Sequence, residues 1–120
     1  MAKITSFKEL SVWQKSHELV LEIYKITKSF PVEEKFGLAS QMKRAAVSVA
    51  ANIAEGFKRK GIKDKINFYN ISQSSLSELE YYTILTKDLN YSEGLEKIGL
   101  LIEETGKMLN GLISSIRTQP

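Results

Sequence analysis

A stripe of polar side chains recurs at three- and four-residue spacing along one segment, and its residue types could bind a polar ligand or take part in catalysis. The stripe consists of Gln41, Arg44, Ser48, Asn52 and Glu55. Residues three and four apart share a helix face, so the spacing places all five on one edge of a helix. We interpret the edge as a structural network that fixes the position of a neighbouring helix. A ligand site or catalytic groove, and a subunit interface, remain as alternatives.

The residues that could complete such a network lie in the following segment. If that segment forms a helix antiparallel to the first, residues at equal sequence distance before and after residue 61 should lie at the same level along the two helices. It pairs Arg44 with Glu78, Ser48 with Ser74, and Asn52 with Asn70. The predicted network therefore includes Glu78 and an arginine–carboxylate pair.

A cluster of cationic residues surrounds a single predicted loop. Its members are Lys58, Arg59, Lys60, Lys63 and Lys65, and Lys43 and Arg44 precede it on the same predicted helix. Lysine and arginine side chains contact phosphates irrespective of sequence, so these seven residues are candidates for binding nucleic acid. The alternative is a solvated loop that serves solubility.

Several classes of chemistry lack the residues they need. The chain has no cysteine and its single histidine is His17. A di-iron bundle requires Glu-x-x-His pairs, but residue 14 is glutamine. The stretch from Gly56 to Gly61 lacks the Lys-Ser/Thr that completes a phosphate-binding loop. We therefore predict no catalytic residues, no metal and no cofactor, and we expect that the protein is not an enzyme.

Length and composition predict one globular domain over residues 1–120. The chain is 42% apolar and 26% charged, which is ordinary for a folded protein. Its charge of +3 is uneven: residues 1–65 carry 13 Lys/Arg against 7 Asp/Glu, and the remainder carries 4 against 7. No apolar run approaches the ~20 residues that span a bilayer, and no signal-peptide pattern begins the chain. We expect a cytoplasmic protein that does not bind a membrane.

Apolar residues recur with helical period along almost the whole chain. They predict four helices over about 11–29, 37–59, 63–89 and 93–116, with Ser92 as the N-cap of the last. The connections are too short to cross a bundle, so sequential helices should pack side by side. The predicted fold is all-α, an antiparallel up-down four-helix bundle.

Some apolar residues are left over once each core stripe is filled. These are Leu21 and Tyr24, then Val47, Ala51 and Ala54, and finally Tyr81, Ile84 and Leu85. The segment 37–59 is apolar nearly all round, which is typical of a helix that is buried on both sides. In so small a bundle the second side would meet another chain, so we predict a homo-oligomer with these eight residues as interface candidates. An alanine-rich outer face that serves helix propensity is the alternative.

Three segments resemble one known family. They are residues 7–15 (FKELSVWQK), residues 36–56 with QMKRAAVS and NIAEG, and residues 68–80 with FYNIS and SSLSELE. Together they resemble the 23S rRNA intervening-sequence proteins, bacterial four-helix-bundle proteins that are related to the accessory variability protein of diversity-generating retroelements. The resemblance covers about residues 6–115, and its polar signature falls on Gln41, Arg44, Ser48, Asn52, Glu55, Glu78 and Glu80.

The resemblance implies an up-down bundle that assembles as a ring-shaped homopentamer, with no established catalytic activity. It also implies contact with RNA or DNA, because the related accessory protein is basic and works with nucleic acid. We therefore predict a non-enzymatic scaffold with a nucleic-acid-binding surface that has no sequence specificity. The alternative is a protein-binding adaptor with no nucleic-acid role.

Overall fold

A computed structural model describes residues 3–118 and contains four long helices and no strand in that range. The helices are α1 (Ser11–Thr27), α2 (Leu38–Lys58), α3 (Ile62–Asp88) and α4 (Glu96–Arg117). Two short 3-10 helices, η1 (Phe7–Glu9) and η2 (Val32–Glu34), precede α1 and α2. The all-α prediction is confirmed.

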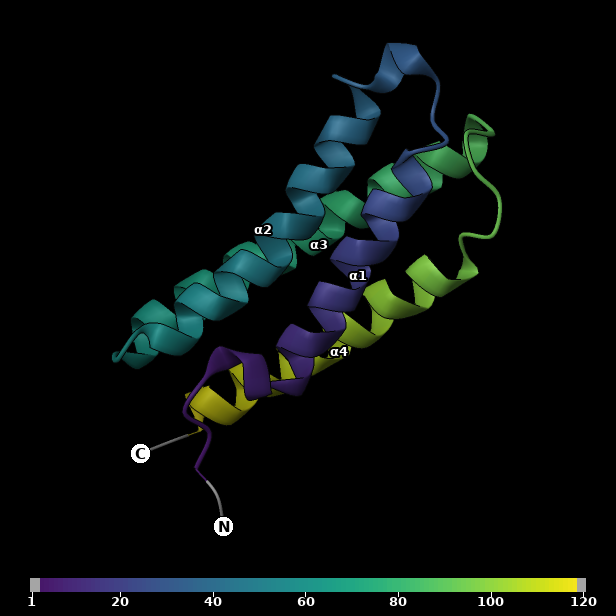
Figure 1. The fold of residues 1–120 in the computed structure, drawn as a ribbon. Helices are drawn as coiled ribbons and strands as arrows, with labels where there is room; N and C mark the ends of the chain where they lie inside the picture. The colour runs from purple at the N-terminus through teal and green to yellow at the C-terminus, as the bar shows by residue number, and fades with distance from the viewer. Residues whose placement is uncertain (1–2, 119–120) are drawn as a thin grey trace.

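The helices form a closed square in which every helix packs against its two neighbours in sequence order. Contacts join α1 to α2, α2 to α3, α3 to α4 and α4 back to α1, while the two diagonal pairs make none. The α2–α3 hairpin lies at the same end of the bundle as the two chain termini, and both remaining connections lie at the other end (Figure 1). This arrangement is the predicted antiparallel up-down bundle.

The core consists of the apolar stripes that the helical period identified. Leu19, Ile23, Met42, Ile53 and Leu79 are completely buried. Burial of one such side chain stabilises the fold by roughly 1.5–3 kcal/mol, so the stripes decide how the helices face one another.

Helices α2 and α3 pack closely over the half of their length nearest the hairpin. Gly56 lies against the buried ring of Tyr69, and a Cβ added at Gly56 would stand 2.5 Å from Tyr69 Cε1. One helical turn further on, Ser72 Oγ donates to the carbonyl oxygen of Val49 at 2.8 Å. These contacts fix how α3 is placed along α2.

The predicted start of the last helix is wrong by about one turn. Helix α4 begins at Glu96, and Ser92 Oγ donates to the carbonyl of Glu93 instead of capping a helix. The chain leaves α3 through Asn90, whose φ is 58°, and the N–H of Tyr91 donates to the carbonyl of Thr86. This left-handed C-terminal motif lengthens the connection.

Candidate nucleic-acid interface and adjoining groove

The tip of the α2–α3 hairpin carries the cationic cluster, on a loop of only three residues. Lys58, Arg59, Lys60 and Lys63 are all exposed. Arg59 lies 4.6 Å from the centre of the Phe68 ring and forms a 3.1 Å ion pair with Glu55. The structure therefore brings these four predicted cations together on one protruding surface, which we call the basic tip.

Lys65 belongs to the same cluster in sequence but has a different role. Its Nζ donates to the carbonyl oxygens of Gly56 at 3.1 Å and Phe57 at 2.7 Å, at the C-terminal end of α2. Burial lowers the pKa of this amine. Lys65 thus satisfies carbonyls that the helix leaves unpaired, and its charge offsets the negative end of the helix dipole.

Lys43 and Arg44 lie apart from the basic tip. Fifteen residues separate Lys43 from Lys58 on α2, which corresponds to about 22 Å at 1.5 Å per residue. The Nζ of Lys43 stands 5.3 Å from the centre of the Tyr24 ring on α1. The seven predicted contacts therefore divide into a tip, a helix cap and a separate pair.

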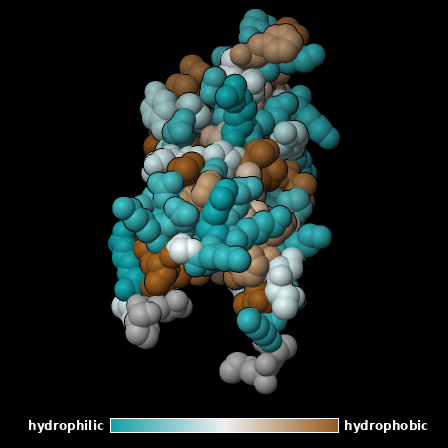
Figure 2. Space-filling model, turned by 90° about the vertical axis from the view of Figure 1, so that its left-hand side faces the viewer, coloured by the Kyte–Doolittle hydropathy of each residue, from teal (hydrophilic) through white to brown (hydrophobic). Residues whose placement is uncertain are grey.

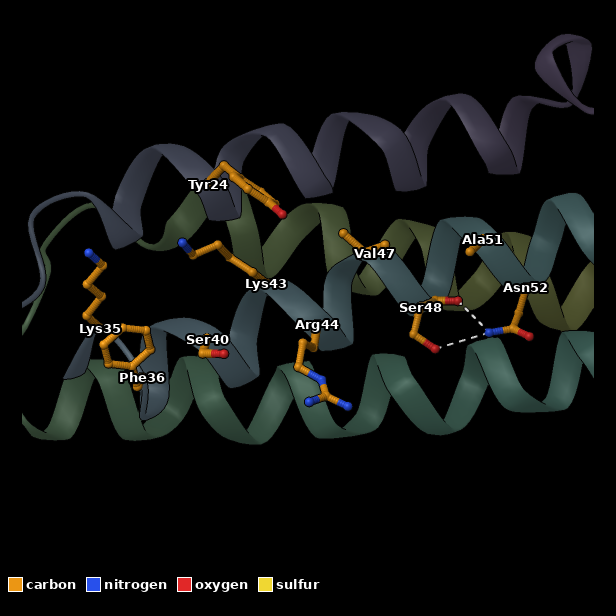
Figure 3. A pocket seen from close by; sticks show the side chains of 10 residues that line it. All are labelled: Tyr24, Lys35, Phe36, Ser40, Lys43, Arg44, Val47, Ser48, Ala51 and Asn52. Atoms are coloured by element: carbon orange, nitrogen blue, oxygen red, sulfur yellow. Dashed lines mark hydrogen bonds between the residues drawn. The ribbon is translucent and has the colours of Figure 1, made fainter.

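An open groove of about 670 Å³ runs over the outer face of α2 (Figure 3). Its lining combines three cations, two aromatic rings and small or polar residues: Tyr24, Lys35, Phe36, Ser40, Lys43, Arg44, Val47, Ser48, Ala51 and Asn52. No acidic residue lines it. We call this surface the α2 groove.

Three residues of the polar stripe, Arg44, Ser48 and Asn52, line this groove, and the hydrogen bonds of the stripe involve fewer residues than predicted. Asn52 Nδ2 donates to the carbonyl and the hydroxyl oxygen of Ser48 at 2.8 and 3.1 Å (Figure 3). Ser75, and not the predicted Ser74, donates to Ser48 at 2.8 Å. One residue corresponds to 100° of helix rotation, so Ser74 lies on the exposed side of α3.

The charged members of the stripe stay outside this network. Arg44 forms no ion pair with another described residue, so the expected Arg44–Glu78 pair is not formed. Glu78 accepts a 3.4 Å hydrogen bond from Tyr82, while Glu55 is bound to Arg59. Gln41 is exposed. The network thus consists of Ser48, Asn52 and Ser75.

Two comparisons with known proteins bear on this arrangement. The family model of the 23S rRNA-intervening sequence protein matches residues 8–111. The chain belongs to this family. No curated protein matches the chain significantly.

Among solved structures, this member of the 23S rRNA-intervening sequence family is similar to a protein from Bacteroides thetaiotaomicron VPI-5482. That protein is described as having unknown function and as belonging to the S23 ribosomal protein family. The two share 30% identity with a TM-score of 0.79, over 86% of this chain and 95% of the other. Neither comparison tests the relation to the retroelement accessory protein, which stays a prediction.

The eight interface candidates of this family member differ in exposure. Leu21, Tyr24, Val47, Ala51, Tyr81 and Ile84 are exposed, Ala54 is half-buried, and Leu85 packs against the core. The space-filling view shows hydrophobic residues as separate patches between charged ones (Figure 2). Leu85 is half-buried like Ala54, so all eight are at least partly accessible to another chain.

Residues 3–118 of this family member hold no group of three or more His, Cys, Asp or Glu side chains placed to bind a metal. None of the helices in that range is both long and apolar enough to cross a membrane. His17 is exposed and stacks on Trp13 with ring centres 5.0 Å apart.

Sequence reasoning missed Lys35 and Phe36 as groove residues. Phe36 is 88% exposed and follows η2, in the connection between α1 and α2. The signal was available, because an aromatic residue between a proline and a helix-starting glycine belongs to no helical stripe. Because Phe36 lies between two predicted helices, it belongs to no apolar helix face, and this indicates that its ring is not part of the core.

Proposed function

We propose that this member of the family is a homo-oligomeric scaffold without enzymatic activity, whose basic tip binds the phosphate backbone of nucleic acid. The observation that carries the proposal is the exposure of Lys58, Arg59, Lys60 and Lys63 in and beside the three-residue loop that joins α2 to α3. Binding through phosphates alone has no sequence specificity, since phosphates position a protein but carry no base information.

The distribution of charge along the bundle supports this assignment. Residues 58–65 contain five cations and one carboxylate, Asp64. At the opposite end, the connection over residues 28–37 contains two cations and two carboxylates, and that over 87–97 contains two cations and three carboxylates. Only the hairpin end therefore presents a net positive field to a polyanion.

Oligomerisation strengthens such a surface. A single tip offers three or four phosphate contacts, and binding through so few is weak at physiological salt. Several tips held in one particle bind one strand together, because the second contact becomes intramolecular. The exposed apolar side chains of α1, α2 and α3 support self-association.

The geometry of the polar stripe supports a non-enzymatic role. Asn52 and Ser75 both donate to Ser48, so the hydroxyl of Ser48 lies beside an amide and a second hydroxyl and not beside a base that could activate it. The adjoining groove is open to water along α2. A catalytic site of this kind would need exclusion of water to strengthen its electrostatics.

The test is fluorescence anisotropy with a labelled single-stranded RNA of mixed sequence across a series of salt concentrations. The double variant Lys60→Glu/Lys63→Glu should bind at least tenfold more weakly. Its plot of log K against log salt should be shallower by up to about 1.4, from a slope of about 0.7 per lost contact. Glutamate is tolerated at residue 63, in the first turn of α3, so folding should be retained.

The matched control is Lys25→Glu/Lys28→Glu, which changes the net charge equally at the end of α1. It should leave the affinity within twofold of the unaltered protein. Equal losses in the two variants would show that net charge, not the tip, attracts RNA. Salt-independent binding, or none, would overturn the nucleic-acid role and favour the protein-binding adaptor.

A further inference from the structure

We infer that neighbouring copies associate head to tail, with Phe36 of one copy inserted into a cavity between α3 and α4 of the next. The inference rests on the homo-oligomeric part of the proposed function and assigns the two surfaces that meet. The first surface is the α2 groove, and the second lies on the opposite side of the bundle. The two surfaces are complementary in shape and opposite in charge.

Phe36 has the form of a protruding knob. It is 88% exposed, the highest value among the large hydrophobic residues of the described chain. It stands at one end of the α2 groove, with Lys35 Nζ 5.5 Å from its ring centre. A free phenylalanine ring that no element of its own chain covers gains most from a pocket in another molecule.

A cavity of about 480 Å³ at the junction of α3 and α4 has the form of the matching hole. Its apolar wall consists of Ile84 and Leu95, with the small residues Thr83 and Gly94 beside them. Its charged lining residues are Glu93, Glu96 and Lys87, so carboxylates outnumber cations. Because α2 and α4 are diagonal in the square of helices, this cavity and the α2 groove lie on roughly opposite sides of the bundle.

The knob and the hole lie at the same height along the bundle. Tyr91 Oη donates to Glu34 Oε2 at 2.8 Å, so these two residues define one level. Phe36 is two residues from Glu34, while Asn90 and Ser92 of the cavity flank Tyr91. A second copy rotated about an axis parallel to the helices would therefore bring its Phe36 level with this cavity.

The charges of the two surfaces match in the same register. Lys43 and Arg44 lie between Met42, which contacts Thr86, and Ser48, which contacts Ser75. Glu80 lies between residues 75 and 86 of α3, and is therefore level with the two cations.

Glu80 lines a further groove of α3 and α4 together with Glu103. Glu80 forms no ion pair with another described residue, and Glu103 pairs only with the exposed Lys107. The α2 groove, in contrast, contains cations and no carboxylate. Head-to-tail contact would thus set Lys43 and Arg44 of one copy against Glu80 and Glu103 of the next.

Small residues allow the two surfaces to approach closely. The α2 groove has Ser40 and Ala51 on its floor, and the facing groove has Ser77, Gly99 and Gly106. Apart from the backbone of its own helix and its chain neighbours, no atom of residues 3–118 lies within 4 Å of a Cβ added at Gly99. In the proposed contact, the open space beside Gly99 is filled by the neighbouring copy.

This contact is heterologous, because different surfaces of the two copies meet. Repetition of such a contact by rotation about an axis parallel to the helices closes a ring when the rotation is a whole fraction of a full turn. Every copy then points the same way, and all basic tips lie on one rim. The inference therefore explains how weak tips would act together on one strand.

The test uses engineered cysteines, since the chain has none of its own. Phe36→Cys and Ile84→Cys are made in separate chains, mixed under conditions of subunit exchange, oxidised and run on a non-reducing gel. The mixture should form a disulfide-linked dimer, and Phe36→Cys alone should not. Dimers from Phe36→Cys alone would indicate a symmetric contact and would overturn the inference. Absence of a dimer in the mixture would overturn it as well.

Light scattering on variants separates this inference from the proposed function. Phe36→Asp should reduce the mass of the particle to that of the monomer, while Ile71→Asp should leave it unchanged. Ile71 is a matched control because it is a large apolar residue that is 40% exposed and lines neither groove nor cavity. If Phe36→Asp retains the full mass, the assigned surfaces are wrong although the scaffold stands. If the unaltered protein is itself a monomer, the homo-oligomeric proposal fails.

Discussion

The two ends of the bundle are held together in different ways. At the hairpin end, a three-residue loop joins α2 to α3, and the adjoining turns interlock through Gly56, Tyr69 and Lys65. At the other end, two longer connections meet through a hydrogen bond from Tyr91 to Glu34 and the packing of Phe30 on Tyr91. The first end is fixed by contacts within one hairpin, and the second by contacts between segments that are far apart in sequence.

This difference matches the roles that we assign to the two ends. Like charges repel one another, so closely packed helix ends are needed to hold four exposed cations in and beside a three-residue loop. A surface that binds another copy needs a cavity instead. The longer connection between α3 and α4 forms part of the wall of such a cavity. The predictions below test each end by removing the contact that holds it.

The largest expected effect is at the hairpin end, in Gly56→Ala. The added methyl group would lie 2.5 Å from Tyr69 Cε1 and 2.8 Å from Cδ1, and the ring is buried and cannot swing away. Overpacking of this kind costs roughly 1–3 kcal/mol of unfolding free energy. Urea unfolding followed by circular dichroism measures the change.

Gly111→Ala on α4 is the control for this substitution. Residue 111 is exposed and nothing lies within 4 Å of an added Cβ. Alanine there should stabilise the protein by about 0.5–1 kcal/mol through helix propensity. If both variants shift stability in the same direction, the Gly56–Tyr69 contact does not fix the hairpin.

Much of this arrangement could be predicted from the sequence, and the errors have physical causes. The helical period of the apolar residues predicts four amphipathic helices, and the structure buries one face of each, including Leu19, Met42 and Leu79. The predicted start of α4 is wrong because Ser92 is a good N-cap by type, while Gly94, two residues later, has a φ of 67°, which a right-handed helix does not contain. The conformation of this connection depends on tertiary contacts such as that of Tyr91 with Glu34, which the local sequence does not reveal.

The candidate site was predicted less well than the fold. Cation counts located the basic tip, but could not show that Lys65 is used as a helix cap or that Lys43 lies on another surface. The polar stripe was placed on the correct edge of α2, whereas its partner on α3 was wrong by one residue. The pattern of apolar residues predicts which face of a helix is buried. Which residues of two helices contact each other depends also on the rotation and crossing angle of the helices, and the pattern of one segment does not determine these.

A smaller loss is expected from Lys65→Met, which keeps the aliphatic stem and removes the charged donor. The carbonyls of Gly56 and Phe57 lose their shared partner, and the end of α2 loses a favourable charge. We expect a loss of about 1 kcal/mol in unfolding free energy, since the partly exposed amine is screened by solvent.

RNA binding distinguishes Lys65 from the free cations of the tip. Lys65→Met should leave the affinity within about twofold, whereas Lys60→Met should weaken it more. Each substitution removes one positive charge. A difference in RNA affinity between the two variants therefore reflects that the amine of Lys65 is bound to carbonyl oxygens. Greater weakening by Lys65→Met would mean that its amine leaves the carbonyls to bind phosphate.

The smallest effect is expected at the opposite end, in the pH dependence of the Glu34–Tyr91 contact. The N–H of Leu38 and then the hydroxyl of Tyr91 donate to Glu34 and hold the pKa of its carboxyl below the usual range. The same hydrogen bond raises the pKa of the Tyr91 phenol. Glu34 should therefore add stability that is complete above the ordinary pKa of glutamate and is lost as pH falls through the lowered value.

Tyr91 behaves in the opposite sense. A phenol with a raised pKa adds stability that is complete below its ordinary pKa and is lost as pH rises through the raised value. Tyr91→Phe should thus unfold at lower urea than the unaltered protein at neutral pH, with the difference shrinking in both acid and alkali. Tyr81→Phe, at an exposed position on α3, is the control. If Tyr91→Phe unfolds at the same urea concentration as the unaltered protein at neutral pH, the hydroxyl adds nothing, and Tyr91 stabilises this end only through the ring packing on Phe30 that the phenylalanine keeps. A loss that stays constant across pH would show that the contribution of the hydroxyl does not depend on the charge of Glu34.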